Sequence, residues 1–444
     1  MVWMTATEAL NILNVRPQTL YAKVSRGKIR AKADDADPRR SLYHRDDVLC
    51  MARRANGRRK IDTVSAQAMQ WGDPVLPSSI STAANDCLLY RGHDAAVLAE
   101  SATLEQVAAL LWECEPSTIQ AALIAGTGAA STAPAPSADT GTAAPAATNT
   151  QGCAAPAKAT AAASAQPATA LACGLLALAT LAAGDAPSLG RPAHALRADA
   201  AMVLAALTDA FIGASTSTST GASTSTSTGA PSDNAAATIS ARLADAWQCR
   251  QHEDLLRRAL VLMADHELNA STFATRVAVS TGASLSAGVL AGLATLTGPL
   301  HGGASAQFAQ LLTLAEQTSA QEAVGQWLAS GRPLPGFGHR LYPEGNPRAK
   351  ALLNVLPKRE PFAALAAEAE AQAGELPTVD FALPLLAATC GLPADAPFVL
   401  FALGRCVGWL AHALEQAQAN RPIRPRARYI GPAAVALAGQ EISG

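Results

Sequence analysis

What this sequence lacks excludes several classes of protein. Its 444 residues carry 34 Lys and Arg against 35 Asp and Glu, so the whole chain has no strong polyelectrolyte character. None of the 8 cysteines belongs to a Cys-x-x-Cys pair, and no metal site is predicted. No charged start followed by an apolar core resembles a signal sequence, and a run such as "LACGLLALATLAAG" is shorter than the ~20 apolar residues that cross a bilayer. We therefore expect a cytoplasmic protein with free thiols, two or three folded units and no membrane contact.

The first sixty residues differ in charge from the rest of the chain, with 14 Lys and Arg against 6 Asp and Glu. Thr5 and Glu8 have the spacing of a capping box ahead of a short apolar helix, which "NVRPQ" would end. A second helix is expected from about Pro17 to Arg26, with Gly27 as its C-cap. "KIRA" and "SLYHRDDV" then predict two strands around a polar loop. Residues 1–60 are therefore predicted to form a winged helix-turn-helix domain.

The stretch "TATEALNILNVRPQTLYAKVSRGKIRA" resembles the MerR-like or excisionase-like winged class. That resemblance implies a second helix that enters the major groove of DNA and a wing that touches the phosphate backbone. The candidates for DNA contact are Gln18, Thr19, Tyr21, Lys23 and Arg26 on the helix, and Arg39 and Arg40 on the wing. The alternative is a small basic domain that contacts protein.

The rest of the chain alternates helical patterns with low-complexity segments. Residues 126–169 are nearly all Ala, Thr, Ser, Pro and Gly, and residues 213–235 contain the octapeptide "GASTSTST" twice in tandem. Both segments lack the large apolar side chains that offset the entropy of ordering, so we interpret them as insertions. Residues 170–212 are assigned to a helical part of a large domain, and apolar residues at three- and four-residue spacing persist from 236 almost to the end. We therefore expect a mainly α-helical fold.

Three polar islands interrupt the apolar helices: "ADHELNAS" around His266, "GPLHGG" around His301 and "LPGFGHRLYPEGNPRAKAL" around His339. A single histidine beside an apolar helix is often only a core or capping residue. The glycines beside His301 and His339 would, however, let the backbone approach a ligand closely, and the helix starts that follow could hold an anion or a polarised carbonyl. Arg348, and Arg405 in the apolar "LFALGRCVGWLAH", would need a carboxylate or phosphate partner if buried.

The ordered set "ADHELNAS", "GPLHGGA", "PGFGHRLY", "NPRA", "VDF", "GRCVGWLAH" and "IRPRARY" resembles the citrate synthase family. The likeness is clear over residues 236–432 and weaker around "LLYRGHDAAVLAESATLEQVAALLW". It implies large and small helical domains, with residues 61–125 as the start of the family region and 236–444 as its catalytic core. Family members are usually homodimers that close over oxaloacetate and an acyl-CoA. No cofactor is implied, because acyl-CoA is a co-substrate.

The resemblance assigns a role to each motif. His301 would donate a hydrogen bond to the thioester carbonyl while Asp380 of "PTVDFAL" removes a proton from the adjacent carbon, because a lone carboxylate is too weak a base for that step. His339 would donate to the keto oxygen of oxaloacetate, after which water hydrolyses the thioester. The expected substrate contacts are His266, Arg348, Arg405 and, reaching across the dimer, Arg424, while Ser271 would orient His301.

Two positions depart from the family pattern. Met263 stands where many relatives have a histidine, and Pro343 stands where relatives often have a basic residue. A second interpretation stays open, in which the synthase-like domain senses a carboxylate or CoA ester and controls DNA binding. Such a sensor would need the arginines but not Asp380, so the complete set of His301, His339 and Asp380 favours the enzyme. The choice between acetyl-CoA and propionyl-CoA is left open, since one methylene changes binding by only ~1 to 3 kcal/mol.

Overall fold

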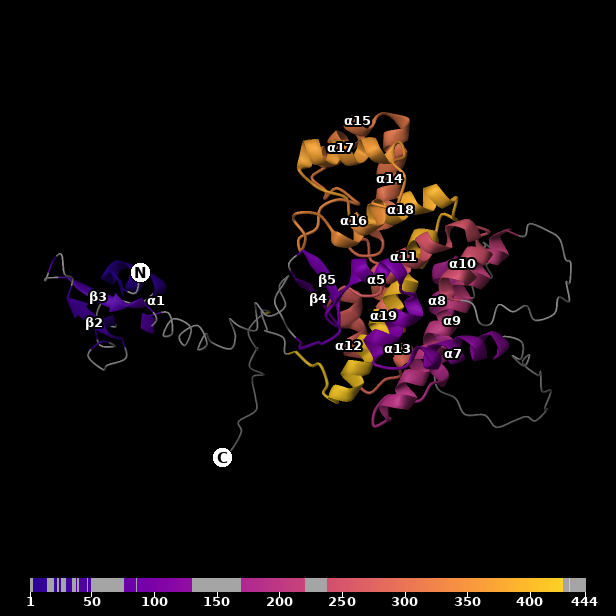
Figure 1. The fold of residues 1–444 in the computed structure, drawn as a ribbon, viewed down its shortest axis with the longest axis horizontal. Coiled ribbons are helices and arrows are strands. Elements are labelled where there is room, and N and C mark those ends of the chain that lie inside the picture. The colour runs from indigo at the N-terminus through magenta and orange to yellow at the C-terminus, as the bar shows by residue number, and fades with distance from the viewer. Residues whose placement is uncertain are drawn as a thin grey trace, which may run out of the picture. The chain divides into compact units, whose positions relative to one another are not determined.

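The computed structural model (Figure 1) describes residues 3–13, 20–21, 24, 29–33, 37, 40–45, 47–48, 76–84, 86–129, 169–219, 238–425 and 431. They belong to two compact units, one formed by residues 1–77 with 424–444 and the other by residues 78–423. The two segments interpreted as insertions lie largely outside the described residues.

The N-terminal unit contains a short helix and a small sheet. Strand β1 (Trp3–Met4), helix α1 (Ala6–Leu13), β2 (Ala31–Ala33) and β3 (Ser41–His44) follow in chain order, and the antiparallel sheet has the order β1-β3-β2. The predicted capping box is confirmed, since the backbone N–H of Thr5 donates to the Glu8 carboxylate at 2.8 Å and that of Glu8 to the Thr5 hydroxyl at 3.4 Å. The two wing strands pair with each other, although β2 begins only at Ala31, and β1 adds a strand that was not predicted.

The second helix predicted for this unit lies mostly outside the described residues. Only Leu20, Tyr21 and Val24 of it are described, all three in helical conformation. Leu20 is buried in a small apolar core together with residues of α1 and β3. The helix-turn-helix assignment therefore stays a prediction.

The second unit is built almost entirely from helices, which confirms the prediction of a mainly α-helical fold. It opens with a small antiparallel sheet of β4 (Ser81–Ala84), β5 (Cys87–Tyr90) and β6 (His93–Asp94). The α-helices that follow are α5 (Ala95–Ser101), α6 (Leu104–Trp112), α7 (Pro116–Ala129), α8 (Ala170–Gly184), α9 (Ala193–Ser219), α10 (Ile239–Ala246), α11 (Glu253–Met263), α12 (Ala270–Ser280), α13 (Leu285–Leu296), α14 (Ala304–Gln317), α15 (Ala320–Ala329), α16 (Pro347–Leu353), α17 (Phe362–Ala373), α18 (Val379–Cys390) and α19 (Ala396–Ala419).

Two of these helices extend beyond the boundaries expected from composition. Helix α7 reaches Ala129 and α9 reaches Ser219, several residues into the segments interpreted as insertions. Ala214, inside the first octapeptide, is buried in the core. Starting a helix is costly, but each residue added to an existing helix gains a backbone hydrogen bond. Small residues such as Ala, Ser and Thr can therefore continue a helix that apolar packing has already stabilised. The helices therefore end later than composition indicates.

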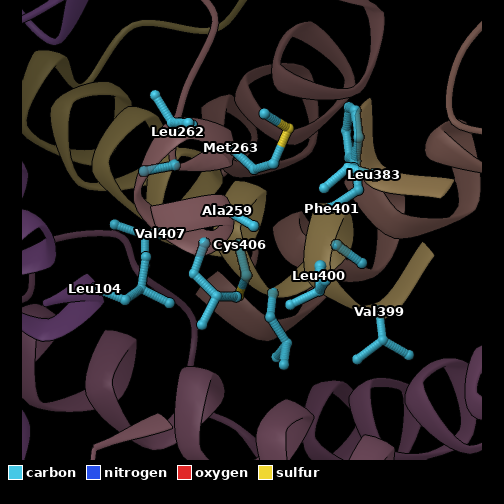
Figure 2. Packing of buried hydrophobic residues seen from close by; sticks show 14 of the residues in the cluster. Leu104, Ala259, Leu262, Met263, Leu383, Val399, Leu400, Phe401, Cys406 and Val407 are labelled. Atoms are coloured by element: carbon cyan, nitrogen blue, oxygen red, sulfur yellow. The ribbon is translucent and has the colours of Figure 1, made fainter. Parts of the chain in front are cut away.

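Helix α19 is the central helix of the second unit and contacts α6, α9, α11, α12, α13 and α18. Its length and composition would allow it to cross a membrane, but 94% of its apolar window is buried within the protein, as in a core helix. Figure 2 shows its Phe401, Cys406 and Val407 packed among side chains of α6, α11 and α18. Gly404 permits the close approach of α11, because a Cβ there would lie 2.7 Å from the carbonyl oxygen of Leu260.

Helices α14, α15 and α17 form a group beside α18 (Figure 1), in which α15 packs on both α14 and α17 while α14 packs on α18. Phe308 lies at the centre of this group, with its ring centroid 5.4 Å from that of Phe381 and 5.9 Å from that of Phe362. The turn before α14 and the start of α18 join the group to the helices around α19. These two junctions carry His301 and Asp380.

Candidate active site

The three polar islands of the sequence meet in the folded second unit. The rings of His266 and His339 lie at right angles, with centroids 5.2 Å apart. The charges of Arg348 and Arg405, together with His301 and His339, all lie close enough to His266 to lower its pKa, although burial is the largest cause. The fold therefore brings together residues that are spread over more than a hundred positions of the chain.

His301 lies in the turn between α13 and α14, and its double glycine serves the packing of that turn. A Cβ on Gly302 would lie 2.6 Å from the carbonyl oxygen of Leu296, and one on Gly303 would lie 2.8 Å from that of Gly298. Both glycines are thus required by contacts with the preceding chain. Gly302 and Gly303 also line a cavity of about 320 Å³, so the expected close approach to a ligand stays a prediction.

His301 accepts or donates one side-chain hydrogen bond, since its Nε2 lies 2.8 Å from the hydroxyl of Ser271, the residue predicted to orient it. The same hydroxyl accepts a hydrogen bond from the indole N–H of Trp409 at 3.1 Å and lies 2.8 Å from the amide oxygen of Asn269. Burial, aided by the charge of Arg405, lowers the pKa of His301 to about 4. The imidazole is therefore neutral at physiological pH.

His339 is also a neutral imidazole, because burial and then the charge of Arg348 lower its pKa to about 4. The backbone N–H of Leu341 donates to its Nδ1 at 3.2 Å. Since a neutral imidazole has one donor nitrogen and one acceptor nitrogen, the proton must be on Nε2. Nε2 of His339 is thus a hydrogen-bond donor.

The two arginines predicted to bind carboxylates are buried, Arg348 with 3% and Arg405 with 1% of its surface exposed. Arg405 donates from Nε to the carbonyl oxygen of Met263 at 3.2 Å and lies 4.8 Å above the ring of Phe401. Nε and Nη1 of Arg348 are buried without a hydrogen-bond partner among the described residues. Unpartnered N–H groups on a buried guanidinium are costly, so the arrangement leaves two donors that a bound anion would satisfy.

Asp380 lies in the first turn of α18, where its backbone N–H donates to the capping hydroxyl of Thr378 at 3.3 Å. Its carboxylate oxygen Oδ1 is buried and has no hydrogen-bond partner in the described part of the chain. Burial raises the pKa of Asp380 to about 6, against the opposing charges of Arg348 and Arg405. A carboxylate with a raised pKa and no partner is suited to act as a base.

Asp265 is a buried charge that sequence reasoning missed, although it directly precedes His266. Its carboxylate accepts hydrogen bonds from the hydroxyl of Ser81 and, at 3.3 Å, from Nε2 of His412. Burial opposes its ionisation, but His412 and Arg405 hold its pKa below the ordinary value. The motif around His266 identified this polar segment of the sequence. It could not identify the partners of Asp265, because His412 is 147 positions away and Ser81 is 184 positions away.

Tyr342 is a second residue that the sequence did not single out. It is buried, and its hydroxyl lies 3.2 Å from Nε2 of His266. Together with His339 and Pro343 it lines a cavity of about 220 Å³. Met263, the other departure from the family pattern, is fully buried in the apolar core.

The remaining predicted residues are not brought to this site by any described contact. Arg424 is exposed and is grouped with the N-terminal unit. Tyr21 and Arg40 are exposed, and Arg40 forms an ion pair with Asp37 at 3.3 Å. The other candidates for DNA contact, Gln18, Thr19, Lys23, Arg26 and Arg39, lie outside the described residues.

Comparison with curated proteins finds relatives that share part of the chain. "Citrate synthase 2" of Bacillus subtilis is 39% identical over 190 residues, which are 40% of this chain and 51% of that protein. "2-methylcitrate synthase" of Mycobacterium tuberculosis is 33% identical over 185 residues, which are 39% of this chain and 47% of that protein. The matched region thus spans about half the length of the curated relatives.

Solved structures share the fold over a greater length. The citrate synthase of Thermotoga maritima superimposes with a TM-score of 0.63 at 24% identity and covers 83% of this chain and 97% of its own. The Thermoplasma acidophilum citrate synthase, solved with carboxymethyl coenzyme A and oxaloacetate, gives a TM-score of 0.62 at 24% identity and covers 82% and 96%. The family model described as "Citrate synthase, C-terminal domain" matches residues 69–426. The chain therefore belongs to the citrate synthase family.

Proposed function

We propose that this protein condenses oxaloacetate with an acyl-CoA and hydrolyses the resulting thioester, as a citrate or 2-methylcitrate synthase. The observation that carries this proposal is Arg348, a buried guanidinium with unpartnered N–H groups, beside Asp380, a carboxyl whose pKa is raised to about 6. The first calls for an anionic ligand and the second for a proton to remove.

The number of buried guanidinium groups at the site matches the two carboxylates of a dicarboxylate. The two buried arginines supply two positive charges, and Asp265 and ionised Asp380 oppose them. Oxaloacetate would bring two carboxylates, one for Arg348 and one for Arg405, with His266 as a further contact. Arg424, contributed across a homodimer, would add one more positive charge beside the bound dianion.

The base in the proposed reaction is Asp380. Its carboxylate takes a proton from the carbon next to the thioester carbonyl, and the electron pair of that C–H bond moves toward the carbonyl oxygen. His301, as a neutral imidazole, donates a hydrogen bond to that oxygen and so stabilises the enol-like nucleophile. A neutral donor is suited to this role because no charged imidazolium has to be buried when the substrate closes the site.

The second step forms a carbon–carbon bond. The nucleophile attacks the keto carbon of oxaloacetate, while Nε2–H of His339 donates to the keto oxygen as charge develops on it. Water then attacks the thioester, and the C–S bond breaks to release CoA as a free thiol. Ser271 holds His301 through the 2.8 Å contact with Nε2, and for His301 to donate from Nδ1 the Ser271 hydroxyl turns its proton from Asn269 to Nε2. The scheme requires no cofactor besides acyl-CoA.

A thiol-release assay tests this proposal. Purified protein is mixed with oxaloacetate and either acetyl-CoA or propionyl-CoA, without added metal, and free CoA is measured. We expect thiol release that requires oxaloacetate and is lost in Asp380→Asn, and the ratio of the two rates would identify the preferred acyl group. Absence of oxaloacetate-dependent thiol release with both thioesters would contradict the proposal.

For the N-terminal unit we propose contact with DNA, through the second helix and the wing. The exposed side chains of Tyr21 and of Arg40, which directly precedes β3, support this assignment. Fluorescence anisotropy with a labelled duplex tests it, and affinity should fall steeply with salt if arginines contact phosphates. If no thiol is released but oxaloacetate or CoA changes duplex affinity, the protein is a metabolite-sensing regulator instead.

A further inference from the structure

Tyr342 lies beside two of the site's histidines and has no role in the scheme above. Its ring centroid is 5.7 Å from that of His266 and 5.0 Å from that of His339. The side chain is 2% exposed, and its hydroxyl lies 3.2 Å from Nε2 of His266. Within the described part of the chain this is the one hydrogen bond that the hydroxyl makes.

The direction of that hydrogen bond follows from the chemistry of the two groups. Burial raises the pKa of Tyr342 to about 12, so the hydroxyl keeps its proton, and burial holds the pKa of His266 well below its ordinary value, so the imidazole is neutral. If Nε2 carried the imidazole proton, the buried hydroxyl proton would have no acceptor, which is costly. The hydroxyl therefore donates to Nε2, and the proton of His266 resides on Nδ1.

The neighbouring histidine has the opposite tautomer, fixed by a different device. The backbone N–H of Leu341 donates to Nδ1 of His339, so Nε2 carries that proton. Tyr342 is part of the same turn, because its own backbone N–H donates to the carbonyl oxygen of His339 at 3.0 Å. One turn of chain, residues 339–342, thus sets the donor nitrogen of both imidazoles.

We propose that Tyr342 is a positioning residue that holds His266 as the neutral Nδ1–H tautomer, so that Nδ1 donates a hydrogen bond to bound oxaloacetate. The inference rests on the proposed function for the identity of the ligand, but not for the tautomer. His266 keeps 9% of its surface exposed, and its Nδ1 has no protein partner among the described residues, which leaves this donor for a ligand. Without the hydroxyl, both neutral tautomers of His266 would be populated. Only the molecules with the proton on Nδ1 could then donate a hydrogen bond to oxaloacetate.

The test replaces Tyr342 by Phe, which keeps the ring beside the two histidines and removes only the hydroxyl. We expect the KM for oxaloacetate to rise about 10-fold if the competent tautomer falls to a tenth of the population, with a smaller change in kcat. In protein labelled with ¹⁵N at histidine, the ring nitrogen shifts of His266, assigned by comparison with His266→Gln, should identify protonated Nδ1 in the wild type and a mixture in Tyr342→Phe. Tyr43→Phe, which alters a buried tyrosine of the N-terminal unit, serves as the matched control and should change neither quantity.

Two results would overturn the proposal. One is a wild-type His266 that is protonated on Nε2. The nitrogen shifts of the wild-type protein show this directly, so the result does not depend on whether Tyr342→Phe folds. The other is a Tyr342→Phe protein with an unchanged tautomer or an unchanged KM. Failure of the proposed function is recognised separately, because the wild type would then release no thiol while the nitrogen shifts still report the tautomer.

Discussion

Two arginines of this protein, Arg276 and Arg348, are buried to the same extent, each with 3% of its surface exposed, but their surroundings differ. Arg276 donates to Gln416 at 3.1 Å, to Nδ1 of His412 at 3.0 Å and to the Glu415 carboxylate at 2.5 Å. Arg348 has no partner for Nε or Nη1 among the described residues. The same side chain, equally buried, is satisfied by the protein in one place and left open in the other.

The difference distinguishes charge that serves the fold from charge that awaits a ligand. Around Arg276 each partner is itself held, since Glu415 also accepts from the backbone and hydroxyl of Ser79, and His412 donates to Asp265. Around Arg348 the neighbouring Asp380 also has an unpartnered oxygen. Burial alone therefore does not mark an active site, whereas two neighbouring buried charged groups that both have unpartnered atoms indicate one.

The largest expected effect is on the open carboxylate. We expect Asp380→Asn to lower kcat by about 1,000-fold or more, because loss of a general base removes up to ~10⁴-fold. Affinity for oxaloacetate should remain, since Asp380 is not a carboxylate ligand. Steady-state thiol release and calorimetric titration measure the two quantities, and near-normal turnover in this variant would sink the proposed mechanism.

The two arginines can be exchanged for Met as a matched pair. Arg276→Met should destabilise the fold by about 3 kcal/mol, because it leaves His412 and Glu415 without their partner, while the KM for oxaloacetate changes little. Arg348→Met should leave the unliganded fold as stable as before, or more so, and raise that KM by about 100-fold. Urea denaturation measures the free energy of unfolding of each variant, and steady-state kinetics measures its KM for oxaloacetate. Equal losses of stability in both variants would remove the distinction between the two sites.

Removal of the imidazole of His301 tests the oxyanion role at the same site. We expect His301→Ala to lower kcat by about 100-fold, comparable to deleting one oxyanion donor, with little change in affinity for oxaloacetate. Ser271→Ala, which keeps the imidazole but removes its 2.8 Å hydrogen bond, should have a smaller effect on kcat. A larger loss in Ser271→Ala than in His301→Ala would contradict the assignment.

The last prediction concerns stability and pH. The pKa of Asp380 is about 6 in the folded protein against an ordinary value of 3.8, so its contribution to stability is fully present below about pH 4 and is lost as pH rises through about 6. Asp380→Asn should therefore be more stable than the wild type at pH 7 to 8, by up to about 3 kcal/mol. Melting temperatures across this range measure it. A difference that is independent of pH would show that burial of the charge is not its cause.

Local patterns were read from the sequence more fully than long-range ones. The capping box of Thr5 and Glu8 spans three positions, and the structure contains both of its hydrogen bonds. The hydrogen bond between Ser271 and His301 was also anticipated, but only because the family resemblance pairs the two motifs. Periodicity predicted the helices because each helix turns one apolar face to the core.

The parts that escaped prediction depend on contacts between distant segments. Asp265 and His412 are 147 positions apart, and no local sequence pattern indicates that an aspartate and a histidine so far apart form a hydrogen bond. Tyr342 has the composition of an ordinary core residue, and only the packed structure places its hydroxyl beside His266. The glycines after His301 were interpreted as room for a ligand, and the structure adds a second reason for them, the nearby carbonyl groups of Leu296 and Gly298. Sequence identifies the reactive groups, but the partners that set their protonation come from the fold.

The most direct test of the central claim, that Arg348 and Arg405 form a dicarboxylate site, is a calorimetric titration of the wild-type protein with oxaloacetate and with pyruvate, which lacks the second carboxylate. The account predicts saturable binding of oxaloacetate, binding of pyruvate weaker by about 100-fold or more, and loss of this preference in Arg348→Met but not in Arg276→Met. Equal affinity for the two acids, or a preference that persists without Arg348, would contradict it.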